Sequence, residues 1–290
     1  MIKKSIFIAV ILLVIFETII RFSNIQWDTS QNDKSANLIS AQNFIYNFPA
    51  EDIANDTVII GSSISRKLVT DSLGKRFVNL AFNAWSSYDG LELVKLTQKK
   101  PACLLIEMNV VGNQKLQEDV TASLSPVSYY PNKAFKSFQL QNQPVGLVVG
   151  YLKNMLKARM EEMKLKKREN QELYNLNVSM EKEKLINVLP DSILNARFNV
   201  LKKLIEDFKK QNIRIVFFEV PFDEQLMNTA TVIKTREYFH QYFSNKEYKY
   251  IGLPAVNDFI YSDGIHLSGK SAIVYTQYLK TELNNIKNSN

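Results

Sequence analysis

Two adjacent hydroxyl side chains end an apolar run in the stretch VIIGSSISRKL, where Ser62 and Ser63 follow Gly61. Polar residues typical of a helix come directly after them. A hydroxyl at the C-terminal end of a buried strand lies where open α/β sheets bind ligands, and the next helix adds backbone N–H groups there. We expect Ser63 to be a nucleophile. Gly61 would allow the turn, and the Ser62 side chain would support it.

A hydroxyl nucleophile needs a general base, and the chain has two histidines, His240 and His266. His240 lies in the aromatic, helical stretch TREYFHQYF, which favours a packing or surface role. His266 lies in YSDGIHLSGKSA, three residues after Asp263, and Gly264 allows a tight turn between them. Such a turn can place the carboxylate against one ring nitrogen, which fixes the tautomer and stabilises the imidazolium. The spacing therefore predicts that His266 is the base and Asp263 its partner.

Acyl transfer also needs hydrogen-bond donors aimed at the oxyanion that develops on the substrate. Asn109 follows the apolar stretch LLIEM, and Ala84 follows VNLAFN. Because both stretches are predicted strands, we expect both residues at the same edge of the sheet as Ser63. The expected donors are the Asn109 side chain and the backbone N–H groups of Ser63 and Ala84.

Short runs rich in β-branched and aromatic residues alternate with helical stretches from residue 57 onward. Their near-continuous apolar character is typical of parallel strands buried on both faces. We therefore predict an α/β fold, a three-layer α/β/α sandwich with a mainly parallel sheet. The predicted strands are 57–61, 76–82, 102–108, 213–220 and 248–253. The predicted helices lie around 64–73, 88–99, 191–211, 231–243 and 268–287.

Residues 114–190 separate the third and fourth predicted strands by far more chain than a usual crossover. They contain VGYLKNMLKARMEEMKLKKRENQELYN, which has the pattern of a long charged helix. We interpret residues 114–190 as a helical insertion. Two roles stay open for it: a solvated helical hairpin packed on the domain, or a basic lid or docking surface for a membrane or partner.

The first residues, MIKKSIFIAVILLVIFETIIRF, have the pattern of a membrane-spanning helix. The apolar part is slightly short for a span, but Lys3, Lys4 and Arg21 can reach the headgroups from its ends. No small-residue cleavage site follows, which favours an uncleaved signal anchor over a cleaved signal peptide. The paired lysines favour a cytoplasmic N-terminus, so we expect a single-pass protein of the cytoplasmic membrane with its main domain outside. The expected parts are a signal anchor over 1–24, a tether over 25–55 that leads into a short helix, and an α/β domain over 56–290.

The composition, with 46% hydrophobic and 22% charged residues, is that of a globular protein with a large core. A net charge of +7 suits nucleic acid, an anionic membrane or an envelope polymer. No aromatic and basic stripe, zinc-ligand spacing or helix-turn-helix pattern occurs, so no nucleic-acid partner is expected. The single cysteine, Cys103, lies in an apolar run, and we expect a buried thiol with neither a disulfide nor a metal.

In their order and spacing these motifs resemble those of the SGNH (GDSL-like) hydrolases. That family has a glycine-x-serine turn, a small residue after the second strand, an asparagine after the third, and an aspartate-x-x-histidine near the C-terminus. Here GSS, FNAWSS, EMN and DGIH match, over most of residues 55–285. The resemblance implies a flavodoxin-like sandwich that needs no cofactor. It implies catalytic Ser63, Asp263 and His266, and an oxyanion hole of Ser63, Ala84 and Asn109.

An N-terminal anchor followed by a GSS turn is similar to the membrane-anchored branch of that family, which is associated with O-acylation of cell-envelope polymers. This implies an extracytoplasmic serine esterase or O-acyltransferase. Its substrate would be an acylated, most simply acetylated, carbohydrate, and a multi-pass membrane acyltransferase would be a partner. Two alternatives stay open. One is a non-catalytic scaffold for such an acyltransferase, because Ser62, Ala84 and Val110 replace the family's aspartate, glycine and aspartate. The other is a lipid or thioester hydrolase.

Overall fold

The computed structural model describes residues 2–23, 28–48, 53–74, 76–109, 118–156, 159, 171–255 and 258–288. The chain divides into two units. Unit 1 comprises Met1–Phe48 and Gln117–Lys164, and unit 2 comprises Pro49–Leu116 and Leu165–Asn290.

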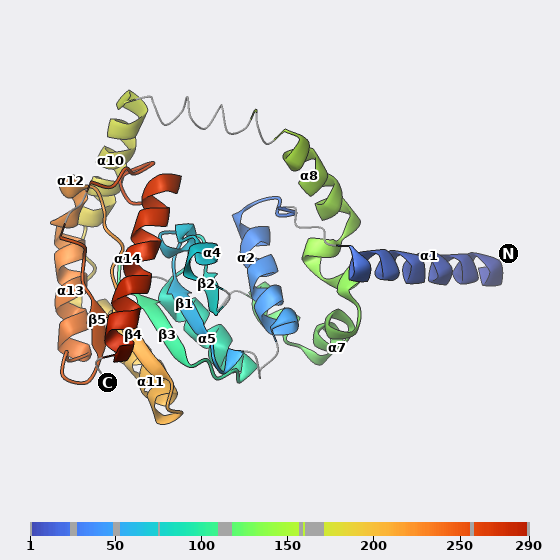
Figure 1. The fold of residues 1–290 in the computed structure, drawn as a ribbon, viewed down its shortest axis with the longest axis horizontal. Helices are drawn as coiled ribbons and strands as arrows, with labels where there is room; N and C mark the ends of the chain where they lie inside the picture. The colour runs from blue at the N-terminus through green and yellow to red at the C-terminus, as the bar shows by residue number, and fades with distance from the viewer. Residues whose placement is uncertain are drawn as a thin grey trace. The chain divides into compact units, whose positions relative to one another are not determined.

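Unit 2 is built on one sheet of five parallel strands in the order β2-β1-β3-β4-β5 (Figure 1). The predicted α/β class and parallel sheet are confirmed, and every strand lies within two residues of its expected bounds. Every residue of β1 and β3 is buried, which explains why their sequences are apolar except at Thr57 and Glu107. The strands are β1 (Thr57–Gly61), β2 (Phe77–Ala81), β3 (Cys103–Glu107), β4 (Arg214–Phe218) and β5 (Lys249–Ile251).

Helices cover both faces of this sheet, as a three-layer sandwich requires. The alternation along β4 shows the two layers: Val216 and Phe218 share a buried cluster with Tyr275 of α14. Phe217 points the other way, and its ring centroid lies 5.5 Å from that of Phe239 in α13. The helices of unit 2 are α4 (Thr70–Leu73), α5 (Ser87–Thr97), α10 (Gln171–Ile186), α11 (Asp191–Lys210), α12 (Glu224–Met227), α13 (Ala230–Tyr242) and α14 (Gly269–Asn288).

The helix expected over 64–73 is broken into a 3-10 turn, η2 (Ser65–Lys67), and the short helix α4. Leu68 between them takes an extended conformation with ψ 134. The backbone N–H of Val69 donates to the Thr276 hydroxyl of α14 instead of continuing a helix. A tertiary contact therefore replaces the local hydrogen-bond pattern here.

Unit 1 is helical and draws on two distant parts of the sequence. Residues 33–47, within the expected tether over 25–55, form α2 and a π-helical turn, and α2 begins with a capping box of Asn32 and Ser35. The expected insertion over 114–190 is divided: α6 to α8 belong to unit 1 and α10 to unit 2. Its elements are α1 (Ile2–Phe22), α2 (Asp33–Gln42), η1 (Asn43–Asn47), α6 (Glu118–Ser123), α7 (Pro126–Ala134), η3 (Lys136–Phe138), η4 (Leu140–Asn142) and α8 (Pro144–Met155).

The predicted long charged helix within residues 149–175 is described only at its ends. α8 ends at Met155 and α10 begins at Gln171, while 157–158 and 160–170 lie outside the described residues.

The N-terminal helix α1 is long and apolar enough to cross a membrane: Lys3–Phe22 has a mean hydropathy of 2.4 over its best window.

Candidate active site

Ser63, His266 and Asp263 form one hydrogen-bonded chain in unit 2. The Nε2 atom of His266 lies 2.9 Å from the Ser63 hydroxyl, although the two residues are 203 positions apart. The other ring nitrogen, Nδ1, lies 2.8 Å from Oδ2 of Asp263. The side chains of His266 and Asp263 are 18% and 31% exposed, so small molecules can reach the chain of groups. A hydroxyl, an imidazole and a carboxylate are thus linked in sequence by hydrogen bonds, which is the arrangement that nucleophilic catalysis uses.

The loop that carries Asp263 and His266 is fixed by hydrogen bonds from its own backbone to the Asp263 side chain. Oδ1 of Asp263 accepts the backbone N–H of His266 at 2.9 Å and that of Ile265 at 3.3 Å. Gly264 between them has φ 93, and a Cβ atom there would lie 2.9 Å from Leu226 Cδ1. The turn therefore needs glycine for both its conformation and its space.

The charge state of Asp263 follows from the same contacts. Burial by itself would raise the pKa of its carboxyl, but the hydrogen bond and charge of the His266 ring, with the two backbone N–H groups, hold the pKa below its usual value. Asp263 is therefore a carboxylate at neutral pH. It can hold the imidazole in one tautomer and stabilise its protonated form.

The turn that presents Ser63 is built around Glu107, the last residue of β3. The carboxylate accepts the backbone N–H of Ser62 at 2.9 Å and that of Ser65 at 3.2 Å, and the Ser62 hydroxyl at 2.8 Å. The Ser62 hydroxyl in turn accepts the N–H of Ile64 at 3.2 Å. Ser63 thus lies in a turn that is fixed on both sides by one carboxylate of the neighbouring strand.

Glu107 is fully buried, and among the residues that the structure describes no basic side chain forms an ion pair with it. This burial raises the pKa of its carboxyl above the ordinary value, and the hydrogen bonds from Ser65 and Ser62 only partly oppose the rise. A Cβ atom on Gly61 would collide with this carboxylate and with the Ser65 hydroxyl. Gly61 is therefore required by the close approach of β3 and not by an unusual φ.

Two backbone N–H groups of this region, those of Ser63 and Ala84, are available for a ligand. Among the described residues, neither the Ser63 nor the Ala84 N–H has an intramolecular hydrogen-bond acceptor. Ala84 follows β2, which pairs with β1 in register, Gly61 opposite Ala81, so its turn lies beside that of Ser63. Ala84 has φ 57, a left-handed conformation that favours glycine and costs alanine roughly 1–2 kcal/mol.

Asn109 has a different environment from the one expected of an oxyanion donor. Its Nδ2 donates to the carbonyl of Val220 at 2.8 Å, and its Oδ1 accepts the N–H of Val220 at 2.8 Å. The side chain thus extends the pairing of β3 with β4 by one step. Asn109 is therefore first of all a link between two strand ends. Only one hydrogen of its Nδ2 atom is left for a ligand.

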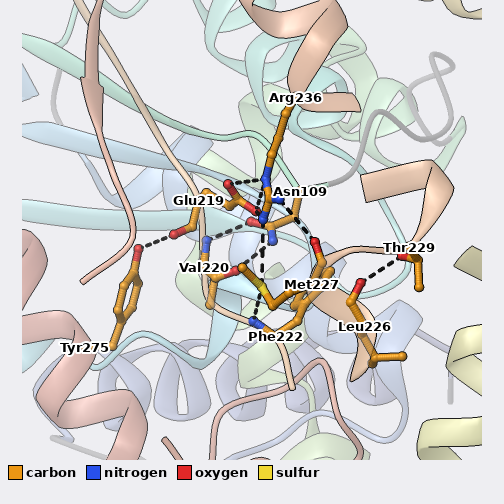
Figure 2. Close-up of polar contacts among 9 residues, drawn as sticks. All are labelled: Asn109, Glu219, Val220, Phe222, Leu226, Met227, Thr229, Arg236 and Tyr275. Carbon is orange, nitrogen blue, oxygen red and sulfur yellow. Dashed lines mark hydrogen bonds and ion pairs between the residues drawn. The ribbon is translucent and has the colours of Figure 1, made fainter. Parts of the chain in front are cut away.

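Behind Asn109, a polar network fixes the segment that follows β4 (Figure 2). Arg236 of α13 binds both carboxylate oxygens of Glu219 at 2.5–2.9 Å and donates to the Met227 carbonyl at 3.1 Å. The Tyr275 hydroxyl donates to the Glu219 carbonyl at 2.6 Å. The same segment reaches the loop that carries Asp263 and His266, because the N–H of Asp223 donates to the Gly264 carbonyl at 2.8 Å.

His240, the second histidine, lies away from these groups on α13. Its Nδ1 lies 3.1 Å from Asn245 Oδ1, and its ring packs on Tyr250 with centroids 4.9 Å apart. Cys103 is a free, buried thiol in β3. Among the described residues, no group of three His, Cys, Asp or Glu side chains could hold a metal ion.

Glu107 is the site residue that the sequence analysis did not single out. The signal was present, since a glutamate in the otherwise apolar stretch ACLLIEM needs a buried partner. Comparison with protein-family models and with curated proteins finds no match for this chain. The function must therefore be argued from the geometry of the site and from its motifs.

Proposed function

We propose that the protein is a serine esterase or O-acyltransferase of SGNH type that uses Ser63, His266 and Asp263. The observation that carries this proposal is the continuous chain from Ser63 Oγ through His266 to Asp263, with separations of 2.9 and 2.8 Å. These three side chains lie at the C-terminal edge of a parallel sheet, where such folds bind ligands. The flavodoxin-like SGNH fold is part of the proposal.

In the first half-reaction, Ser63 Oγ attacks the carbonyl carbon of an ester while His266 Nε2 takes the hydroxyl proton. The tetrahedral intermediate carries its negative charge on the former carbonyl oxygen. Its collapse breaks the bond to the alcohol, which leaves with the proton from His266, and an acyl-Ser63 ester remains. The carboxylate of Asp263 stabilises the imidazolium at each step.

In the second half-reaction, water or a carbohydrate hydroxyl gives its proton to His266 and attacks the acyl-Ser63 carbonyl. Collapse returns the proton to Ser63 Oγ and releases an acid or a new ester. The unpaired N–H groups of Ser63 and Ala84 are the donors we assign to the oxyanion, with the free hydrogen of Asn109 Nδ2 as a third.

For the substrate we propose an acylated cell-envelope carbohydrate on the outer side of the cytoplasmic membrane. Two observations support it: α1, which has the length and apolar character of a membrane anchor, and the motif resemblance to the membrane-anchored SGNH branch. A multi-pass membrane acyltransferase is the proposed source of acyl groups.

A fluorophosphonate probe tests the nucleophile directly, because it forms a covalent bond only with an activated serine. We expect labelling of the wild type and of Ser72→Ala, a partly exposed serine of α4, and no labelling of Ser63→Ala. Equal labelling of Ser63→Ala would remove Ser63 from the mechanism. An unlabelled wild type that still functions in cells would instead favour a scaffold.

The two histidines provide a matched pair for the base. We expect His266→Ala to lower ester turnover by at least roughly a thousandfold, as loss of a triad base does, and His240→Ala to leave it unchanged. Turnover of p-nitrophenyl acetate and of a long-chain ester measures both variants. Faster turnover of the long-chain ester than of the acetate would overturn the carbohydrate substrate in favour of a lipid.

A further inference from the structure

α8 buries two glycines and exposes most of its large apolar side chains. Gly146 and Gly150 are buried, and a Cβ atom on Gly146 would lie only 3.3 Å from the Thr29 carbonyl oxygen. A helix that faces water shows the reverse pattern, with its large apolar side chains turned inward. The outward face carries six large apolar side chains that are 47–65% exposed: Val145, Val148, Tyr151, Leu152, Met155 and Leu156.

The segment of α7 and η3 has the same character and adds basic groups. Its exposed apolar side chains are Val127 (85%), Tyr130 (68%), Phe135 (45%) and Phe138 (41%). Lys133 and Lys136 are exposed among them. Aromatic side chains mixed with lysines are typical of the boundary between lipid headgroups and acyl chains. We call the exposed apolar side chains of α7, η3 and α8 the collar.

The length of α1 explains why such a boundary is needed. The twelve residues of 5–16 contain no charge and span only ~18 Å, whereas the hydrocarbon core is ~30 Å thick. A full span requires the whole of Lys3–Phe22. Glu17, five residues before Phe22, then lies roughly 7–8 Å inside the outer edge of the hydrocarbon.

Unit 1 supplies partners for Glu17 at this depth. Its carboxylate accepts the backbone N–H groups of Lys136 and Ser137 at 3.1 and 2.8 Å and pairs with Arg21 at 2.6 Å. Arg21 also donates to the Ala134 carbonyl. These bonds fix the segment between α7 and η3 to the helix at the level of Glu17, and α7 and α8 flank that end of α1 (Figure 1).

We propose that the collar lies in the headgroup and upper acyl region of the bilayer that α1 spans. α7, η3 and α8 then supply an apolar surface around the polar end of α1, at the ~5–10 Å depth typical of interfacial helices. The long side chains of exposed Lys133 and Lys136 reach from this depth to anionic headgroups. This inference rests on the proposed membrane anchoring of α1.

Lipid quenching of a cysteine-linked fluorophore tests the collar in the full-length protein. Single cysteines carrying NBD are placed at Val148 in α8, at Leu12 in α1, and at Val274 in α14 as a matched control. Val148 and Val274 are 59% and 57% exposed, and native Cys103 is fully buried. The protein is reconstituted alone into phosphatidylcholine and phosphatidylglycerol nanodiscs that contain lipids spin-labelled near the headgroup or near the bilayer centre.

We expect Val148→Cys to lose most of its emission to the shallow spin label and to be blue-shifted, while Val274→Cys keeps its emission. Leu12→Cys should be quenched most by the deep spin label. Quenching of Leu12→Cys with Val148→Cys as bright as Val274→Cys would overturn the collar and leave the anchor intact; the face would then be covered by a protein. An unquenched Leu12→Cys would overturn the anchor and the collar together. Met155→Cys, at 64% exposure, repeats the measurement if Val148→Cys does not fold.

Discussion

Two glutamates, one in each unit, have buried carboxylates within stretches that are otherwise apolar. Glu107 in unit 2 accepts the backbone N–H groups of Ser62 and Ser65, and Glu17 in unit 1 accepts those of Lys136 and Ser137. Each carboxylate thus fixes a segment distant in sequence through two N–H groups. A buried carboxylate is costly unless its oxygens are satisfied, and both units satisfy them with the backbone.

The difference between the two lies in charge compensation. Glu17 has Arg21 one turn away as an ion-pair partner, whereas Glu107 has no such partner among the described residues and a raised pKa. Burial without a fixed cation makes the ionisation of Glu107 depend on pH. The stability of the turn that presents Ser63 should therefore change with pH, whereas the charge of Glu17 is compensated by its ion pair with Arg21.

Removal of the Glu107 carboxyl should have the largest effect. Glu107→Ala leaves two buried N–H groups and the Ser62 hydroxyl without an acceptor, at about 1–3 kcal/mol each. We expect the free energy of unfolding to fall by about 3–5 kcal/mol and fluorophosphonate labelling of Ser63 to be lost. Denaturation followed by tryptophan fluorescence measures the stability. The control Glu247→Ala removes a 64%-exposed glutamate and should change stability by less than about 0.5 kcal/mol; equal losses for the two variants would contradict the role given to Glu107.

Glu107→Gln should have a smaller effect, which depends on pH. An unfolded glutamate loses its proton near pH 4.5, while folded Glu107 keeps it to higher pH. The folded state therefore holds more protons above pH 4.5, and wild-type stability falls as pH rises through this range, by at most about 1.4 kcal/mol per pH unit. Glutamine does not ionise, yet its carbonyl can accept the N–H groups of Ser62 and Ser65.

The stability of Glu107→Gln relative to wild type should accordingly rise between pH 5 and pH 8. Unfolding curves at both pH values measure the difference. A difference that stays constant with pH would mean that Glu107 is already ionised in the folded state at pH 5. In that case the lack of an ion-pair partner for Glu107 would not make the stability of its turn depend on pH.

The strands of unit 2 and the partners of Ser63 were predictable because their signals are local. β1 and β3 are buried on both faces, so their sequences are almost entirely apolar, and the tight turn of Asp263, Gly264 and His266 is contained in four residues. The convergence of these motifs on one sheet edge follows from the parallel topology. No distance between residues had to be known.

Glu107 and Asn109 were harder to interpret because their partners are remote. The pairing of Asn109 with Val220 joins residues 111 positions apart and depends on where β4 ends. Likewise, a short helix was expected near residues 33–47, but its packing was not, since the segments it packs on begin at residue 118. Composition and periodicity describe a segment's own preferences, and these contacts are properties of two segments together.

Substitution of Glu17 should have the smallest effect, confined to unit 1. Glu17→Leu suits the apolar helix α1 but removes the acceptor of the Lys136 and Ser137 N–H groups, which should raise their hydrogen exchange by about tenfold, equivalent to about 1.4 kcal/mol. Exchange measured by mass spectrometry in nanodiscs follows residues 134–138. The control Glu17→Gln keeps one acceptor oxygen and should give a smaller increase. Labelling of Ser63 should be identical in both variants, because Glu17 contacts only unit 1 among the described residues. Unchanged exchange in Glu17→Leu would mean that the segment is held by its own turns, and only Glu107 would then fix a distant segment.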